Sequence, residues 1–229
     1  MDSLWDFPDF DEHELVHFVT DRESGLKALI AIHSTHLGPG AGGVRFWHYA
    51  GGGEAVADAL RLSRGMSYKN AMAELPLGGG KAVILADEAG TKTPAMLAAY
   101  GRAVDGLGGR YVTAEDVGMS VEDMVAISRE TKFVAGLPVG EGSVGGDPGP
   151  HTSYGVYLGV KAAAKRALGK ESLEGLHIAI QGAGSVASGL ARRAAADGAR
   201  LSIADIDSAR AEALAKQTKR LVGDTGHRC

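Results

Sequence analysis

The chain has 229 residues, of which 45% are hydrophobic and 23% are charged, a composition typical of a soluble globular protein with one large or two ordinary domains. Its formal net charge of −4 excludes an overall basic field that would recruit nucleic acid or an anionic membrane. The acidic start does not resemble a signal peptide, and no apolar run approaches the ~20 residues that span a bilayer. The only cysteine is Cys229, which permits no internal disulfide and favours a cytoplasmic setting.

The first predicted element is a β-hairpin. Two β-rich runs, near 14–20 and 26–34, flank a polar turn that ends in Gly25. The segment LGPGAGGVRFW that follows is predicted to be a glycine-rich loop.

Helical spacing then predicts a helix over 54–66 that stops at Gly65. After it, the stretch LPLGGGKAVIL places three consecutive glycines in a loop before a strand at 82–86. Thr93 is a suitable N-cap for a helix that has Pro94 at its first position and runs to about residue 107.

The next segments continue the alternation of strands and helices. RYVTAEDVG reads as a short strand with acids at its C-terminal end, and SVEDMVAISRET begins with a capping-box pattern. Residues 140–150 contain five glycines and two prolines, which favours a hinge. A helix over 153–168 and a strand–helix–strand pattern follow. We therefore expect an α/β protein with two units, 1–145 and 146–229.

The second unit carries a dinucleotide-binding pattern. In IAIQGAGSVA an apolar strand leads through Gly182 and Gly184 into a helix, with the small residue Ala187 where helix and strand pack. Asp205 ends the following strand, where an acid can bind ribose hydroxyls and repel a 2′-phosphate, favouring NAD over NADP. The predicted cofactor-binding residues of this motif are Gly182, Gly184, Ser185, Val186 and Asp205.

The lysine after the three glycines is not part of a phosphate-binding P-loop. That motif requires glycine at 75 and serine or threonine at 82, where this chain has leucine and alanine. A different hypothesis pairs Lys81 with Lys69, because a like charge and partial burial both lower an ammonium pKa and produce a base. The alternative is that both lysines are ordinary solvated charges.

Two further patterns remain open at this level. Glu115 and Asp116 follow a predicted strand at the edge where α/β proteins bind ligands, but they also suit an ordinary helix cap. HELVH matches the zinc-hydrolase pattern H-E-x-x-H, with His13, Glu14 and His17. In the predicted hairpin the two histidines would lie ~13 Å apart, so we expect no metal site there.

With LGPGAGGVRFW, ALRLSRGMSYKNAMAELPLGGGKAVI, YVTAEDVG, GDPGPHTSYGVYLG and IQGAGSVA in this order, the chain resembles the Glu/Leu/Phe/Val dehydrogenase family over about residues 10–215. It is most similar to the leucine dehydrogenase branch. The resemblance implies an N-terminal α/β domain for substrate binding and oligomerisation, followed by a Rossmann-type NAD-binding domain.

The resemblance also implies roles for individual residues. Lys69 would hold the substrate carboxylate, Lys81 would be the base that activates water, and Asp116 would exchange protons with the amino group. Gly42 and Gly43 would offer backbone donors to the substrate. Thr152 would contact the nicotinamide end of the cofactor.

The implied reaction is reversible, NAD-dependent oxidative deamination of a branched-chain or aromatic L-amino acid to a 2-oxo acid and ammonia, carried out by a homo-oligomer. Ala41 is smaller than the leucine common at this position in leucine dehydrogenases, which suggests a roomier side-chain pocket. Family members continue well past the point where this sequence stops, which implies an incomplete Rossmann domain, lower stability from about residue 170 and weaker cofactor binding. The alternatives are a silent oligomerising or ligand-binding remnant and a zinc hydrolase.

Overall fold

The computed structural model describes residues 3–138, 145 and 148–219. The chain divides into two compact units, Met1–Gly146 and Asp147–Cys229, which we call the first and second unit. Most of the segment 140–150, the predicted hinge, lies outside the described residues.

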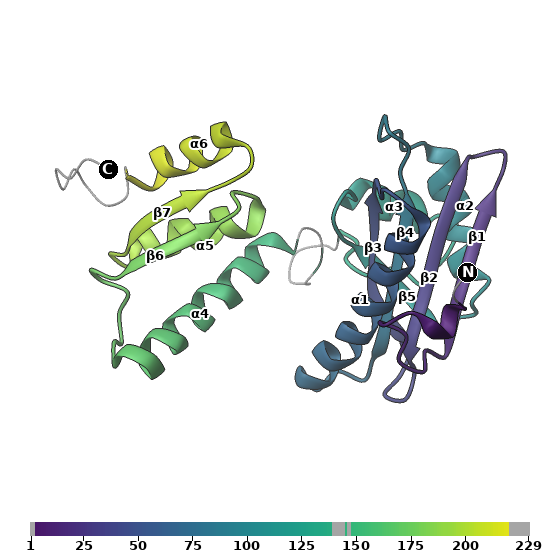
Figure 1. The fold of residues 1–229 in the computed structure, drawn as a ribbon, viewed down its shortest axis with the longest axis horizontal. Coiled ribbons are helices and arrows are strands. Elements are labelled where there is room, and N and C mark those ends of the chain that lie inside the picture. Colours follow the sequence, from purple (N-terminus) through teal and green to yellow (C-terminus); the bar gives the residue numbers. More distant parts are fainter. Residues whose placement is uncertain (1–2, 139–144, 146–147, 220–229) are drawn as a thin grey trace. The chain divides into compact units, whose positions relative to one another are not determined.

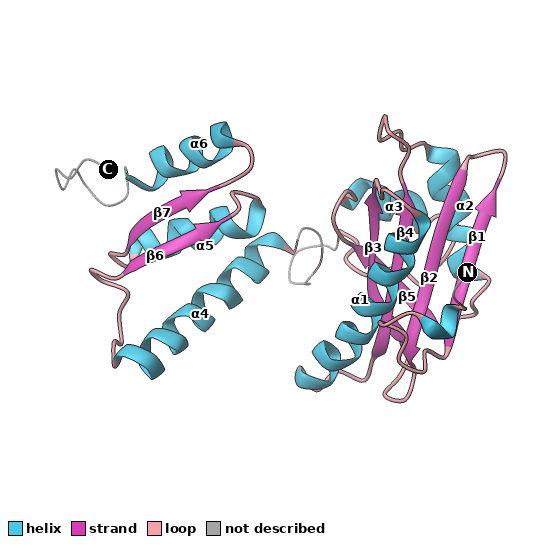
Figure 2. Cartoon of the chain, viewed as in Figure 1, coloured by secondary structure: helices cyan, strands magenta, loops and turns pink. Residues whose placement is uncertain are grey.

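The first unit is built on a five-stranded mixed sheet in the order β1-β2-β4-β3-β5 (Figures 1 and 2). The strands are β1 (Leu15–Asp21), β2 (Leu26–Ser34), β3 (Gly40–Trp47), β4 (Gly78–Leu85) and β5 (Tyr111–Glu115). β2 pairs antiparallel with β1 and β4, whereas β3 pairs parallel with β4 and β5. The carboxyl ends of β3, β4 and β5 therefore meet at one edge of the sheet.

Helices cover both faces of this sheet. Helix α1 (Gly52–Met72) packs on one face, where Ala59 and Leu60 meet Leu29 and Val83. Helices α2 (Pro94–Asp105) and α3 (Val121–Ile127) pack on the other face, and a 3₁₀ helix (Leu4–Asp6) precedes β1. Because both faces are covered, the central strands are almost continuously buried.

The hairpin and two of the helix starts confirm the sequence predictions. β1 and β2 pair from Leu15↔Ile32 to Asp21↔Leu26, and the turn places Gly25 at φ 72°. Thr93 caps α2, and Ser120 forms a capping box at the start of α3. The predicted strand near RYVTAEDVG is β5.

The two glycine-rich segments predicted as loops are strands, so these predictions were wrong. Gly40–Trp47 is β3, and β4 begins at Gly78 and so includes all three glycines before Lys81. The reason is close packing: a Cβ on Gly79 would lie 2.1 Å from Ser67 Oγ on α1, and a Cβ on Gly80 would lie 2.6 Å from the ring of Tyr111. These glycines let a helix and a tyrosine approach the strand, and they do not mark a turn.

The helix predicted to stop at Gly65 continues to Met72. Gly65 has no heavy atom within 4 Å of its Cβ position and keeps helical geometry. An interior glycine costs a helix only ~1 kcal/mol, and burial of Ser63 and Asn70 on either side extends the packed face beyond it.

The second unit contains a parallel two-stranded sheet with three helices. Its elements are α4 (Gly149–Leu168), β6 (His177–Gln181), α5 (Ser185–Ala196), β7 (Arg200–Ala204) and α6 (Ser208–Lys219). The predicted strand–helix–strand pattern is confirmed, α4 begins four residues before the predicted position 153, and α6 was not predicted. No helix among the described residues is both long and apolar enough to cross a membrane.

Candidate active site

The α1-facing side of the sheet carries a charged side chain in the middle of β4. Lys81 pairs with Ala31 of β2 and lies two residues before Val83, which packs against α1. Since side chains alternate along a strand, Lys81 points to the same face as Val83. Its side chain is only 8% exposed.

Lys81 forms an ion pair with Asp116, the first residue after β5. The amine nitrogen lies 2.7 Å from Asp116 Oδ2, and the Asp116 side chain is 22% exposed. Burial lowers the pKa of Lys81, and Asp116 opposes but does not overcome this effect. Burial alone would raise the pKa of Asp116, but hydrogen bonding and charge from Lys81 and the charge of Arg45 hold it below its ordinary value. The pair therefore joins a lysine that releases its proton easily to a carboxylate that stays ionised.

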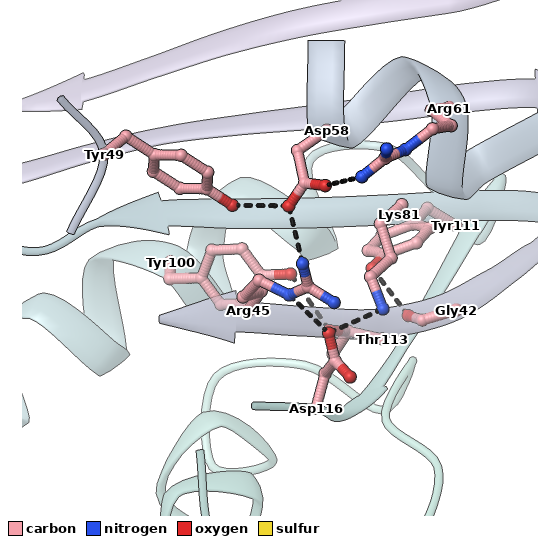
Figure 3. Close-up of polar contacts among 10 residues, drawn as sticks. All are labelled: Gly42, Arg45, Tyr49, Asp58, Arg61, Lys81, Tyr100, Tyr111, Thr113 and Asp116. Atoms are coloured by element: carbon pink, nitrogen blue, oxygen red, sulfur yellow. Dashed lines mark hydrogen bonds and ion pairs between the residues drawn. The ribbon is translucent and has the colours of Figure 1, made fainter. Parts of the chain in front are cut away.

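Arg45, to which no role was assigned from the sequence, lies next to this pair. Its Nε donates to Asp116 Oδ2 at 3.1 Å and its Nη1 donates to Asp58 Oδ2 at 2.7 Å (Figure 3). Tyr49 also donates to Asp58 Oδ2, at 2.8 Å, and Arg61 donates to Asp58 Oδ1 at 2.8 Å. One signal was present in the sequence: Asp58 interrupts the apolar face of a helix, which requires a partner for its charge.

Gly42 and Gly43 lie beside the pair, on β3 between β4 and β5. A Cβ on Gly42 would lie 1.8 Å from the carbonyl oxygen of Gly80, and one on Gly43 would lie 2.8 Å from Cβ of Asp116. The hydroxyl of Tyr111 donates to the Gly42 carbonyl at 2.7 Å. Absence of side chains here allows the three strands to bring Lys81 and Asp116 together.

Lys69 lies exposed in the last turn of α1, as the alternative of an ordinary solvated charge expects. Eleven residues correspond to about three helical turns, so Lys69 lies on the same side of α1 as Asp58. The cation that contributes most to lowering the pKa of Lys81 is Arg45, a role that the like-charge hypothesis gives to Lys69.

The HELVH segment leads into β1, which begins at Leu15, and is not a helix. Nε2 of His13 lies 3.0 Å from both the Leu60 carbonyl oxygen and Ser63 Oγ, while Glu14 accepts the backbone N–H of Thr35 at 2.7 Å. His17 lies on β1 itself. Within the described ranges, no three His, Cys, Asp or Glu residues are grouped so that they could hold a metal ion.

The predicted cofactor residues of the second unit lie around one strand-to-helix turn. Gly182 follows β6 with φ 97°, Gly184 is the N-cap of α5, and Ser185 and Val186 open that helix. Asp205 follows β7, and its Oδ2 accepts the backbone N–H of Ala183 at 2.6 Å.

A surface hollow adjoins this turn. It has a volume of about 360 Å³ and is lined by Gly184, Ser185 and Arg210, among others. Thr152, the remaining predicted cofactor residue, is exposed in the first turn of α4.

Comparison with known proteins identifies the family. Residues 13–133, which include Lys81 and Asp116, match the model of the Glu/Leu/Phe/Val dehydrogenase dimerisation domain. The chain belongs to the Glu/Leu/Phe/Val dehydrogenase family.

Individual members of the family are also similar over most of the chain. Leucine dehydrogenase from Geobacillus stearothermophilus is 53% identical over 90% of the chain and 56% of that protein. Valine dehydrogenase from Streptomyces albus is 50% identical over 85% of the chain and 53% of that protein. The crystal structure of L-tryptophan dehydrogenase from Nostoc punctiforme is 42% identical with a TM-score of 0.67, over 92% of the chain and 58% of that structure. The chain therefore spans little more than half the length of the relatives it matches.

Proposed function

We propose that this chain acts as an NAD-dependent amino-acid dehydrogenase, which converts a branched-chain L-amino acid to the 2-oxo acid and ammonia. The observation that carries the proposal is the buried Lys81–Asp116 pair, with 2.7 Å between Nζ and Oδ2 at a glycine-lined position of the sheet. The leucine and valine dehydrogenases to which the chain is similar support a branched-chain substrate. The tryptophan dehydrogenase relative keeps an aromatic substrate as the alternative.

The chemistry assigned to the pair follows from its protonation states. A lysine with a lowered pKa gives up its proton more readily than a free lysine, and its neutral amine can take a proton from water. That water adds to the carbon of an imino acid. Asp116, held ionised, accepts a proton from the substrate amino group and returns one to the leaving ammonia as the carbinolamine collapses.

Two other groups would bind the substrate. Lys69 would pair with the substrate carboxylate, because its side chain is exposed and lies on the side of α1 that also carries Asp58. Gly42 and Gly43 would contact the substrate through backbone groups, because they present no side chain beside Lys81.

The second unit fits the pyrophosphate of NAD in two respects. Apart from the adjacent residues, no heavy atom lies within 4 Å of the Cβ positions of Gly182 and Gly184, so a ligand can approach this backbone closely. No side chain caps the N-terminus of α5, so its positive end is available to an anion. Bound there, NAD would supply the acceptor for the hydrogen on the substrate α-carbon.

Asp205 and Thr152 complete the cofactor assignment. Asp205 would bind the adenosine ribose, and its charge would oppose a 2′-phosphate. Thr152 would contact the nicotinamide end. We also propose a homo-oligomer, because the matched family model describes a dimerisation domain.

The test is to follow NADH absorbance with L-leucine, L-valine and L-phenylalanine, each with NAD at alkaline pH. Turnover should fall by about 10²–10⁴-fold in Lys81→Ala, the range for loss of a general base. Lys27→Ala, an exposed lysine on β2 of the same sheet, is the matched control and should retain activity. Lack of turnover in folded wild-type protein would instead favour a chain that binds ligands without reaction, an alternative supported by the two-stranded sheet of the second unit.

A further inference from the structure

Arg45 connects two carboxylates from opposite sides of the α1–sheet interface. Its Nε contacts Asp116 Oδ2 at 3.1 Å, and its Nη1 contacts Asp58 Oδ2 at 2.7 Å. The same Asp116 oxygen accepts the Lys81 amine at 2.7 Å, so two cations share one carboxylate oxygen (Figure 3). The rigid, planar guanidinium fixes the relative position of its partners better than a flexible ammonium would.

The guanidinium is itself held in place. Asp58 is nearly buried, and its Oδ2 accepts both Arg45 and the hydroxyl of Tyr49 at 2.8 Å. Arg45 lies on β3, between β4, which carries Lys81, and β5, which Asp116 follows. Each partner of Arg45 is therefore fixed by a different element, and the side chain has little freedom to leave Asp116.

Charged groups reach the face around Lys81 from every element packed against β4. β3 contributes Arg45, the end of β5 contributes Asp116, and α1 contributes Asp58, with Lys69 on the same side of that helix. β2 contributes His33, whose Nδ1 and Nε2 contact Ser67 and Asp11. Among them, Arg45 is the cation that directly contacts the carboxylate paired with Lys81.

We propose that Arg45 is a positioning residue, which Asp58 anchors. Arg45 holds the Asp116 carboxylate against the Lys81 amine and divides that carboxylate between two cations. The proposal rests on the function proposed above. Without Arg45, the Asp116 carboxylate would contact only Lys81 of these two cations. It would then bind the protonated form of Lys81 more tightly. Arg45 thus makes it easier for Lys81 to lose its proton.

The directions of the electrostatic effects agree with this geometry. The charge of Arg45 lowers the pKa of Lys81, while the charge of Asp58 raises it. Loss of the Arg45 side chain should therefore raise the pKa of Lys81. A merely structural role of Arg45 would leave that pKa unchanged.

The test measures the rate of Lys81 acetylation against pH in the full chain, by peptide mass spectrometry after brief exposure to acetic anhydride. The midpoint of this profile should rise by ~0.5–1 pH unit in Arg45→Gln. Arg61→Gln is the matched control, because Arg61 contacts Asp58 Oδ1 but its side chain is 62% exposed. Its midpoint should equal that of the wild type.

A conservative variant separates the effect of the bridge between the two carboxylates from the effect of the positive charge. Arg45→Lys keeps a cation but cannot reach both carboxylates with one planar fork, so its midpoint should lie between those of wild type and Arg45→Gln. A wild-type midpoint in Arg45→Lys would overturn the positioning role, and this result remains decisive if Arg45→Gln fails to fold. A midpoint that stays constant or falls in Arg45→Gln, or an equal rise in Arg61→Gln, would also overturn it.

Failure of this proposal can be distinguished from failure of the proposed function. Acetylation needs neither cofactor nor turnover, so a raised midpoint in Arg45→Gln in protein that forms no NADH would support the role of Arg45 and contradict the dehydrogenase activity of this chain. NADH formation without that rise would support the activity and contradict the role of Arg45.

Discussion

The amine of Lys81 lies 2.7 Å from Oδ2 of Asp116, on a sheet face where the lysine side chain is only 8% exposed. Two opposite effects therefore act on the lysine: burial favours the neutral amine, and Asp116 favours the ammonium. Burial prevails. The same contact lowers the pKa of Asp116. The free energy of unfolding should therefore change by different amounts when one partner or the other is removed.

Removal of Asp116 should destabilise the first unit more than removal of Lys81. Asp116→Ala leaves a buried lysine without its carboxylate and should lower the free energy of unfolding by ~3 kcal/mol. Lys81→Met leaves Asp116 paired with Arg45 and should change it by less than ~1 kcal/mol. Urea unfolding of both variants measures the difference, and equal losses would show that the ion pair is not buried as described.

The close strand packing at Gly42 predicts strong intolerance of any side chain. A Cβ there would lie 1.8 Å from the Gly80 carbonyl oxygen, so Gly42→Ala should cost ~3 kcal/mol or more. Gly65→Ala is the control, because this helical glycine has open space around it and should gain up to ~1 kcal/mol. Thermal unfolding of the two variants would contradict the packing if their melting temperatures moved in the same direction.

The ion pair also predicts a loss of stability in acid. The pKa of Asp116 lies below its ordinary value of 3.8 in the folded chain, so its contribution to stability is present above pH 3.8 and disappears as pH falls through the lower folded pKa. Asp116→Asn should remove this contribution, so its free energy of unfolding should fall less steeply below pH 4. Denaturant unfolding at a series of pH values measures the slope, and parallel curves for the two proteins would be incompatible with a lowered pKa.

The second unit should open more readily than the first. β6 and β7 form a sheet of two strands in which exposed residues alternate with half-buried or buried ones, and Ile206 is fully exposed. β2 and β4, in contrast, are central strands with both faces covered. Amide hydrogen exchange should therefore be faster in β6 and β7 than in β2 and β4. Uniform protection across the two units would contradict this expectation.

Sequence reasoning found the elements that are determined by residues close together in the sequence. The hairpin has its turn glycine, α2 has its threonine cap and proline, and α3 has its capping box, so local chemistry was enough in each case. The prediction failed for the glycine-rich strands β3 and β4, because the role of their glycines depends on what packs against them. Ser67, Tyr111 and the neighbouring strands are remote in sequence, and local patterns do not report them.

The same limit applies to the candidate site. Lys81 and Asp116 were singled out from motif context and from strand ends, and the structure places them in contact. Arg45 and Asp58 were missed because they lie on different elements, β3 and α1, and because Asp116, the other partner of Arg45, follows β5. Their arrangement depends on the order β4-β3-β5 and on the path of α1, neither of which the sequence pattern specified.

The most direct test of the central claim is whether a 2-oxo acid protects Lys81. Acetylation of Lys81 would be followed with increasing amounts of the 2-oxo acid derived from leucine, with Lys27, an exposed lysine on β2, as the internal reference. The 2-oxo acid should slow acetylation of Lys81 and leave that of Lys27 unchanged. An unchanged rate at Lys81 in folded protein would contradict the assignment of this site to amino-acid chemistry.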